Sequence, residues 1–86
     1  MMLLTWDEPK RLANIDKHGL DFAALTYDFF LDCLVMPAKQ GRYIALGQLD
    51  DGTVAVVFIA LGNEALSLIS MRPASKTERR LLNAKK

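Results

Sequence analysis

The sequence predicts an α+β domain in which helices pack against a small antiparallel sheet, with elements in the order β-α-α-β-β-β-β-α. Three observations lead to this fold class. The first third of the chain carries capping signals and apolar residues at helical spacing, whereas the middle alternates short apolar runs with turn signals. A capping box then introduces a basic segment. Because 86 residues that are 51% hydrophobic can build one core, we expect residues 1–86 to form a single domain.

The first expected elements are a short strand over 3–6 and a helix over 8–17. Asp7 is expected to cap this helix, because its carboxylate can accept a backbone N–H of the first turn, and the acidic residue and proline that follow suit a helix start. Gly19 lies where a left-handed residue would end the helix.

A second helix is expected after Asp21, which can cap it. This helix covers 22–29 or 22–30, with its apolar residues on one side. The pattern then changes to the apolar run 33–36, which predicts a strand that Pro37 ends.

The middle of the chain predicts a hairpin. After a loop over 38–41, residues 42–49 form a strand, and the turn Asp50-Asp51-Gly52 returns the chain into a strand over 53–60. Residues 54–59 are apolar at every position, which is typical of a central strand covered on both faces.

The last strand and the last helix follow a second turn. The strand covers 64–72, and Pro73 stops it because proline cannot donate to a ladder. The segment Ser75-Lys76-Thr77-Glu78 fits a capping box, in which the serine and the glutamate each accept the other's backbone N–H. The helix that begins there is expected to dock on the sheet through Leu81 and Leu82.

The composition argues against several classes of protein. Cys33 and His18 are the single cysteine and histidine, which excludes an internal disulfide and a structural zinc site, and we expect no cofactor. The longest apolar run, 54–61, is too short to span a bilayer, and the apolar N-terminus reaches acidic residues too early for a signal peptide. We therefore expect a cytoplasmic protein, neither secreted nor membrane-embedded.

Charge is unevenly distributed, although the formal net charge is only +1. Residues 1–36, 37–71 and 72–86 carry −3, −1 and +5, respectively. A basic terminus of this density attracts a polyanion such as a phosphate backbone, and a solvated helix that merely aids solubility is an equal alternative. Arg72 favours the polyanion, because a strand would hold this charge in place.

His18 and its neighbour Lys17 are the candidates for proton transfer. The alternative role for His18 is to cap the last carbonyl groups of its helix. Lys17 would be the second candidate for the same proton transfers.

Three arginines are candidates for holding an anion. Arg42 opens a strand and shares a face with Ile44 on strict alternation, and it either faces water or binds phosphate. On strict alternation Arg72 shares a mostly apolar face of its strand with Ser70, Leu68 and Leu66. An arginine at the end of such a face is either paired with an acid or aimed at an anion. Arg79, taken alone, would be surface charge.

These residue types suit cleavage of an RNA backbone without a metal ion. That reaction must deprotonate the 2′-OH, stabilise the charge on the phosphorane and protonate the departing 5′-oxygen. Arginine and lysine suit the middle task, and a histidine or a perturbed lysine suits the other two. The sequence shows no pair of acids at a metal-site spacing and no motif of a serine or cysteine nucleophile.

In their order and spacing, these residues resemble the BrnT family of toxins from bacterial type II toxin–antitoxin modules. The matching positions are Trp6, Asp7, Lys10, Asn14, Lys17, His18, Gly19, Phe22, Arg42, Tyr43, Ile44, Gly47, Ile69, Ser70, Arg72, Ala74, Glu78 and Arg79. The resemblance implies a RelE-like fold and a ribonuclease that inhibits translation. The expected catalytic residues are Lys17, His18, Arg42, Arg72 and Arg79, and the expected RNA-binding residues are Lys76, Arg80, Lys85 and Lys86.

The resemblance also implies a protein partner. A BrnA-type antitoxin with a ribbon-helix-helix DNA-binding domain would neutralise the toxin, and the complex would contact operator DNA to repress its own operon. The chain departs from the family pattern at Met71, where the family usually has alanine between the serine and the arginine. A second hypothesis is therefore a catalytically weak interaction module of the same fold that binds an antitoxin and tunes its DNA binding.

Overall fold

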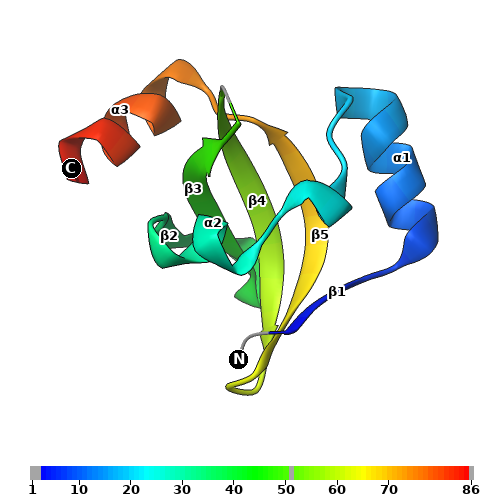
Figure 1. Ribbon diagram of the computed structural model, residues 1–86. Helices are drawn as coiled ribbons and strands as arrows, with labels where there is room; N and C mark the ends of the chain where they lie inside the picture. Colours follow the sequence, from blue (N-terminus) through cyan, green and yellow to red (C-terminus); the bar gives the residue numbers. More distant parts are fainter. Residues whose placement is uncertain (1–2, 51, 86) are drawn as a thin grey trace.

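A computed structural model describes residues 3–50 and 52–85 and has the α+β architecture expected from the sequence (Figure 1). In chain order the elements are β1 (Leu3–Trp6), α1 (Glu8–His18), a 3₁₀ turn η1 (Phe22–Ala24), α2 (Tyr27–Leu31), β2 (Leu34–Pro37), a 3₁₀ turn η2 (Lys39–Gly41), β3 (Tyr43–Leu49), β4 (Gly52–Leu61), β5 (Ala65–Pro73) and α3 (Lys76–Lys85). The predicted order of helices and strands is confirmed. Each predicted strand after the first begins and ends within one residue of the observed one.

The sheet is mixed, which corrects the expectation of an antiparallel sheet. Its strand order is β1-β5-β4-β3-β2, and the last four strands form the predicted antiparallel meander. β1, however, runs parallel to β5, with Leu3 opposite Ala65 and Trp6 opposite Leu68. Parallel neighbours need a long crossover, and the whole chain between β1 and β5 provides one.

A β-bulge in β5 changes which residues share a face. Val57 pairs with Ser70 and Phe58 with Leu68, so Ile69 is an extra residue without a partner of its own. The expectation that Arg72 shares a face with the strand's leucines is therefore wrong. Leu68 belongs to the main core, whereas Arg72 lies opposite Ala55 on the other face of the sheet.

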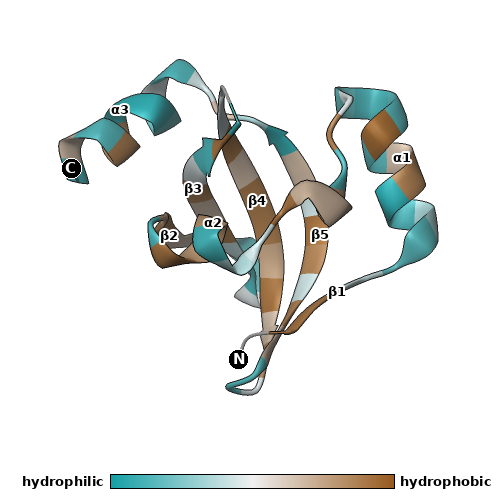
Figure 2. Cartoon of the chain, in the orientation of Figure 1, coloured by the Kyte–Doolittle hydropathy of each residue, from teal (hydrophilic) through white to brown (hydrophobic). Residues whose placement is uncertain are grey.

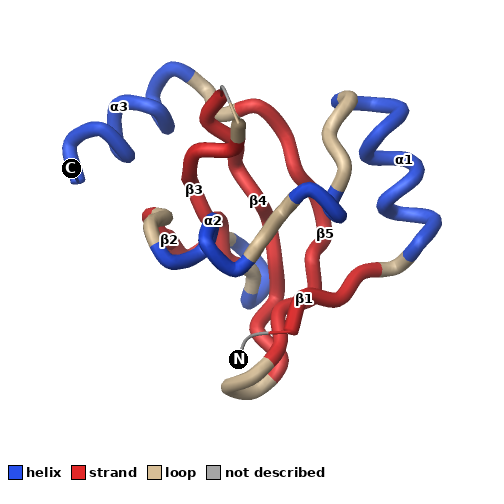
Figure 3. Tube along the Cα trace, viewed as in Figure 1, coloured by secondary structure: helices blue, strands red, loops and turns tan. Residues whose placement is uncertain are grey.

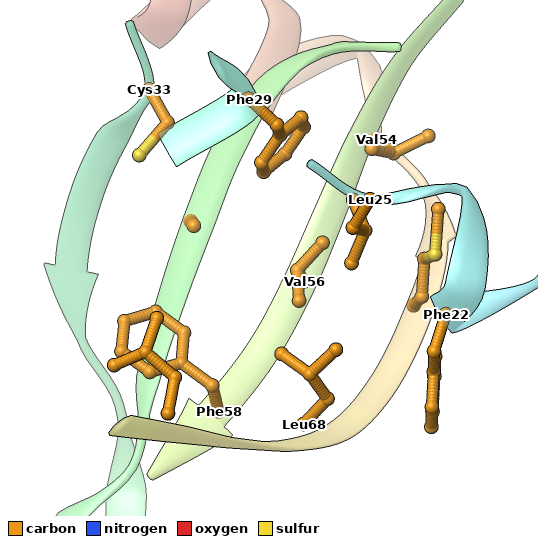
Figure 4. Packing of buried hydrophobic residues seen from close by; sticks show 11 residues of the cluster. Phe22, Leu25, Phe29, Cys33, Val54, Val56, Phe58 and Leu68 are labelled. Atoms are coloured by element: carbon orange, nitrogen blue, oxygen red, sulfur yellow. The ribbon is translucent and has the colours of Figure 1, made fainter. Parts of the chain in front are cut away.

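The main core lies between one face of the sheet and the segment of η1 and α2 (Figure 4). Phe22 from η1 and Phe29 from α2 are buried against side chains of the central strands. The fit is close at Gly47 on β3, where an added Cβ would lie 2.8 Å from Cε1 of Phe29. The glycine therefore makes room for the aromatic ring that anchors α2.

A smaller core occupies the opposite face, where α3 docks. Leu82 is 1% exposed and packs against Leu46 and Ala55. Leu81, its neighbour, is exposed, so only one of the two leucines expected to dock does so. Most residues of α3 are hydrophilic, whereas β4 is hydrophobic along most of its length (Figure 2).

β4 occupies the centre of the sheet as predicted, but it is covered unevenly. On the core face Val54, Val56 and Phe58 are buried. On the other face α3 covers the strand only near Ala55, and Ile59 is exposed.

Two local expectations in the first third of the chain are wrong. Asp7 precedes α1, but its side chain makes no capping hydrogen bond. The helix expected after Asp21 is broken into η1 and α2, because Leu25 and Thr26 are extended (Figure 3). The cap itself is confirmed, since the Asp21 carboxylate accepts the Ala23 N–H. Gly19 ends α1 with φ of 70°, as predicted.

Candidate functional site

The junction between β5 and α3 holds Arg72 in a two-pronged ion pair. Its Nη1 donates to Oε1 of Glu78 at 2.6 Å, and its Nη2 donates to Oε2 at 2.9 Å. The Glu78 side chain is only 14% exposed. The hydrogen bonds from Arg72 lower the pKa of Glu78 to about 2, while the carboxylate raises the pKa of Arg72. Of the two alternatives for this arginine, pairing with an acid is therefore observed.

The same carboxylate caps α3. Ser75 N–H donates to Oε1 of Glu78 at 2.8 Å, and Glu78 N–H donates to Oγ of Ser75 at 3.1 Å, so the predicted capping box is confirmed. Glu78 thus links the first turn of α3 to the end of β5. The sequence pattern identified Glu78 as a cap, but not as the partner of Arg72.

Arg79 lies at the same junction. Its Nη1 donates to the carbonyl oxygen of Ala74 at 3.2 Å, and the residue is exposed to solvent. The structure therefore brings Arg72 and Arg79 to one end of the sheet. Arg79 adds positive charge where the chain passes from β5 into α3, whereas the charge of Arg72 is balanced by Glu78.

Lys17 and His18 lie in a groove between α1 and β5. This groove is a cavity of about 220 Å³ lined by Lys10, Ala13, Asn14, Lys17, His18, Ile69 and Ser70. Lys17 is exposed and His18 is half-buried. Ser70 lies two residues before Arg72, which corresponds to roughly 7 Å along a strand. The groove is thus adjacent to the arginine junction, with β5 connecting them.

Asn14 fixes α1 beside this groove. It is the one buried polar residue among those that the structure describes, and its Oδ1 accepts the N–H of Met71 at 3.0 Å. Its Nδ2 donates to the carbonyl oxygen of Leu20 at 2.9 Å. Neither Asn14 nor Lys10 is among the site residues expected from the sequence. The available signal was their spacing of four and eight residues before His18, which places them on one helix face.

Arg42 is not brought to the junction. It directly precedes Tyr43, which pairs with Phe58 of β4. Arg72 pairs with Ala55 of β4. Because Ala55 also pairs with Leu46 on its other side, Arg72 lies level with Leu46 of β3. Arg42 and Leu46 are four residues apart along the chain, which corresponds to about 13 Å along a strand. The structure accordingly places Arg72 and Arg79 at the junction and Lys17 and His18 in the neighbouring groove, and it leaves Arg42 before the start of β3.

The expected RNA-binding residues differ in their surroundings. Lys76 and Arg80 are exposed on α3. Lys85 instead donates from Nζ to the carbonyl oxygen of Cys33 at 2.6 Å, which ties the end of α3 to the start of β2. Lys86 lies outside the described residues.

A larger cavity, of about 340 Å³, lies between α2 and the end of β3. Its lining includes Asp28, Asp32 and Asp50, whose negative charge does not suit a phosphate backbone. The described ranges 3–50 and 52–85 contain no group of three His, Cys, Asp or Glu side chains that could hold a metal ion. Nor do they contain a helix long and apolar enough to cross a membrane.

The fold and this junction define a small α+β protein with arginine side chains at one end of its sheet. A family model described as the ribonuclease toxin BrnT of type II toxin–antitoxin systems matches residues 6–78. The crystal structure of the Brucella abortus ribonuclease toxin BrnT is 52% identical in sequence, with a TM-score of 0.82. The match covers 88% of this chain and 100% of that one. No curated protein sequence matches. The chain belongs to the BrnT family of ribonuclease toxins.

Proposed function

We propose that this chain is a metal-independent endoribonuclease that inhibits translation in the cytoplasm. The observation that carries the proposal is the adjacency, along β5, of the arginine junction and the groove that holds Lys17 and His18. An RNA strand laid across β5 would meet donors for its phosphate and groups that transfer protons. Lys76 and Arg80, exposed on α3, would contact phosphates on either side.

The reaction follows from these groups. His18 or Lys17 removes the proton of the 2′-OH, and the 2′-oxygen attacks the adjacent phosphorus. Arg72, with Arg79, stabilises the extra negative charge of the phosphorane, because guanidinium groups donate hydrogen bonds where that charge develops. The bond to the 5′-oxygen then breaks as that oxygen takes up a proton from His18 or Lys17, which the first step left protonated. The products are a 2′,3′-cyclic phosphate and a free 5′-hydroxyl.

The proposal includes a BrnA-like ribbon-helix-helix antitoxin, whose complex with the toxin contacts operator DNA. Membership of a type II toxin–antitoxin family supports an antitoxin partner. Exposed apolar side chains support a protein interface, among them Leu31 at the end of α2 and Val35 on the edge strand β2, which are 63% and 47% exposed.

The first experiment is incubation of the purified protein with bulk RNA in excess EDTA. We expect cleavage that survives the chelator and yields cyclic phosphate ends, and that falls in folded Arg72→Ala and His18→Ala variants. Cleavage that stops with EDTA and returns with added Mg²⁺ would contradict metal independence. Equal cleavage by a folded Arg72→Ala variant would contradict the role of this arginine.

The alternative is a catalytically weak interaction module that binds an antitoxin and modulates its DNA binding. One observation favours it: Glu78 already neutralises the charge of Arg72. Expression in bacteria separates the two functions, because only the ribonuclease arrests growth in a way that Arg72→Ala relieves. A non-toxic wild type that still binds a ribbon-helix-helix partner would favour the module.

A further inference from the structure

Glu78 takes no part in the reaction above, yet it holds the arginine on which that reaction depends. We propose that Glu78 is a positioning residue for Arg72, which fixes the guanidinium so that its Nε–Nη2 edge receives two oxygens of an RNA phosphate. The inference rests on the proposed function, since it assigns the phosphate to RNA. The inference gives Glu78 a role in the reaction, whereas the sequence pattern indicated only that Glu78 caps a helix.

The hydrogen bonds of Arg72 show which edge remains. Arginine has five N–H donors, one on Nε and two on each Nη. Glu78 accepts one donor from Nη1 and one from Nη2, and the carbonyl oxygen of Pro73 accepts a second, longer bond from Nη1 at 3.4 Å. In the part of the chain that the structure describes, Nε and the second Nη2 donor have no partner. These two donors lie on one edge of the planar group, in the spacing that binds a phosphate at two points.

The carboxylate that sets this orientation is itself held. Glu78 accepts the Ser75 N–H as well as both bonds from Arg72, and it is largely shielded from solvent. Its low pKa, caused chiefly by Arg72, keeps it ionised across the physiological range. An arginine side chain otherwise samples many rotamers, and a fixed partner removes that freedom before substrate binds.

The pairing affects chemistry more than binding. Arg72 and Glu78 together are electrically neutral, so the pair adds little long-range attraction for the RNA ground state. Donors fixed in place act where the phosphorane develops its extra charge. Losing the fixed orientation should therefore lower kcat and leave KM nearly unchanged.

The test compares Glu78→Gln with Ser75→Ala as a matched control. Glutamine keeps an oxygen for the Ser75 N–H and suits a capping box, but its NH₂ group cannot accept the second bond from Arg72. Ser75→Ala removes the other half of the box and leaves the carboxylate in place. We expect Glu78→Gln to lower kcat about 10- to 100-fold with KM changed by less than about threefold. Ser75→Ala should lower stability and retain kcat.

A second pair of variants tests whether Glu78 acts through Arg72. In an Arg72→Ala background, Glu78→Gln should cause no further loss of kcat, because the group that it positions is gone. A further loss as large as in the wild-type background would overturn the proposal. So would a Glu78→Gln variant that matches the stability loss of Ser75→Ala while cleaving RNA at the wild-type rate.

A measurement without cleavage separates this proposal from the ribonuclease proposal. The NMR signal of the Arg72 Nε–H group is followed during titration with inorganic phosphate and with a non-cleavable 2′-O-methyl oligoribonucleotide. We expect the signal to shift with both probes in the wild type and to shift less in Glu78→Gln, because a guanidinium without a fixed orientation spends only part of its time against the phosphate. If the wild type shifts but cleaves no RNA, the ribonuclease proposal fails and the positioning role stands. Equal shifts in both proteins, or none in the wild type, would overturn the positioning role.

Discussion

Asn14 and Met71 join α1 to the sheet through one buried hydrogen bond. The Oδ1 atom of Asn14 accepts the Met71 N–H at 3.0 Å, just beyond the stretch of β5 that pairs with β1. Beyond Leu68, β1 no longer pairs with this edge of β5. The Asn14 side chain therefore accepts the Met71 N–H in place of a carbonyl group of a neighbouring strand. This bond sets the distance between α1 and Ser70, and with it the width of the groove beside Lys17 and His18.

Asn14→Ala should destabilise the fold substantially. The substitution leaves the Met71 N–H and the Leu20 carbonyl without partners, and we expect the free energy of unfolding to fall by about 2–4 kcal/mol. Urea titration measures the loss. Asn83→Ala is the control, because Asn83 is exposed on α3 and should change stability by less than about 0.5 kcal/mol. Equal effects of the two substitutions would contradict the role of Asn14.

Gly47→Ala should also destabilise the protein, through overpacking. The new methyl group would meet the Phe29 ring at 2.8 Å, and we expect a cost of about 1–3 kcal/mol. Gly52→Ala is the matched control in the same hairpin, since an added Cβ there has no neighbour within 4 Å. Thermal unfolding of both variants checks the prediction, which fails if Gly47→Ala is as stable as the wild type.

The ion pair between Glu78 and Arg72 predicts a pH dependence of stability. The pKa of Glu78 is lowered from its ordinary value of 4.5 to about 2 in the folded protein. A carboxyl group with a lowered pKa stabilises the fold above its ordinary pKa, and this contribution disappears as the pH falls through the folded value. The stability advantage of the wild type over Glu78→Gln should therefore narrow from about pH 5 down to about pH 2. A constant gap in urea titrations over this range would contradict the pairing.

The arginines should differ in their effect on RNA cleavage. In the proposed reaction Arg72→Ala removes a donor from the developing phosphorane, and we expect kcat to fall about 10²- to 10³-fold. Arg42→Ala, at the far end of β3, should lower kcat by less than about tenfold. Single-turnover cleavage of a labelled oligoribonucleotide measures both effects. A loss of kcat in Arg42→Ala as great as in Arg72→Ala would contradict this prediction. It would mean that the bound RNA contacts both arginines during the reaction.

The basic residues of α3 should separate into binding and structural ones. Lys76→Ala and Arg80→Ala should each weaken RNA binding and reduce the slope of log K against log salt by about 0.7, as expected for one lost contact with a single strand. Lys85→Ala should instead lower stability, because Lys85 contacts the Cys33 carbonyl. Filter binding at several salt concentrations, beside urea titration, distinguishes the two groups. An unchanged salt slope in both Lys76→Ala and Arg80→Ala would contradict RNA contact by α3.

Local patterns predicted the elements well, because the signals that specify them are close in sequence. The capping box of Ser75 and Glu78 spans four residues, and the hairpin of β3 and β4 follows from one turn between two apolar runs. The break between η1 and α2 was missed because the burial of Leu25 outweighs the helical spacing around it.

Long-range features could not be predicted from the same patterns. The parallel pairing of β1 with β5 joins residues about sixty positions apart, and nothing in the short segment Leu3–Trp6 indicates its neighbour. The bulge at Ile69 shifts the alternation by one residue, so the face of Arg72 was assigned wrongly. The positions of the groove and of the arginine junction depend on the pairing of β1 with β5 and on the bulge at Ile69. The residue types could therefore suggest a kind of chemistry, but not which side chains lie close together.

The parallel pairing of β1 with β5 also governs when the protein can complete its fold during synthesis. Trp6 lies opposite Leu68, so the first strand must wait until the last strand has left the ribosome. At about 5–20 residues per second, that delay is roughly 3–12 s. A nascent chain interrupted before β5 lacks the β5 wall of the groove and lacks Arg72 altogether. The same topology that closes the sheet therefore leaves unfinished copies without a complete groove and without the arginine junction.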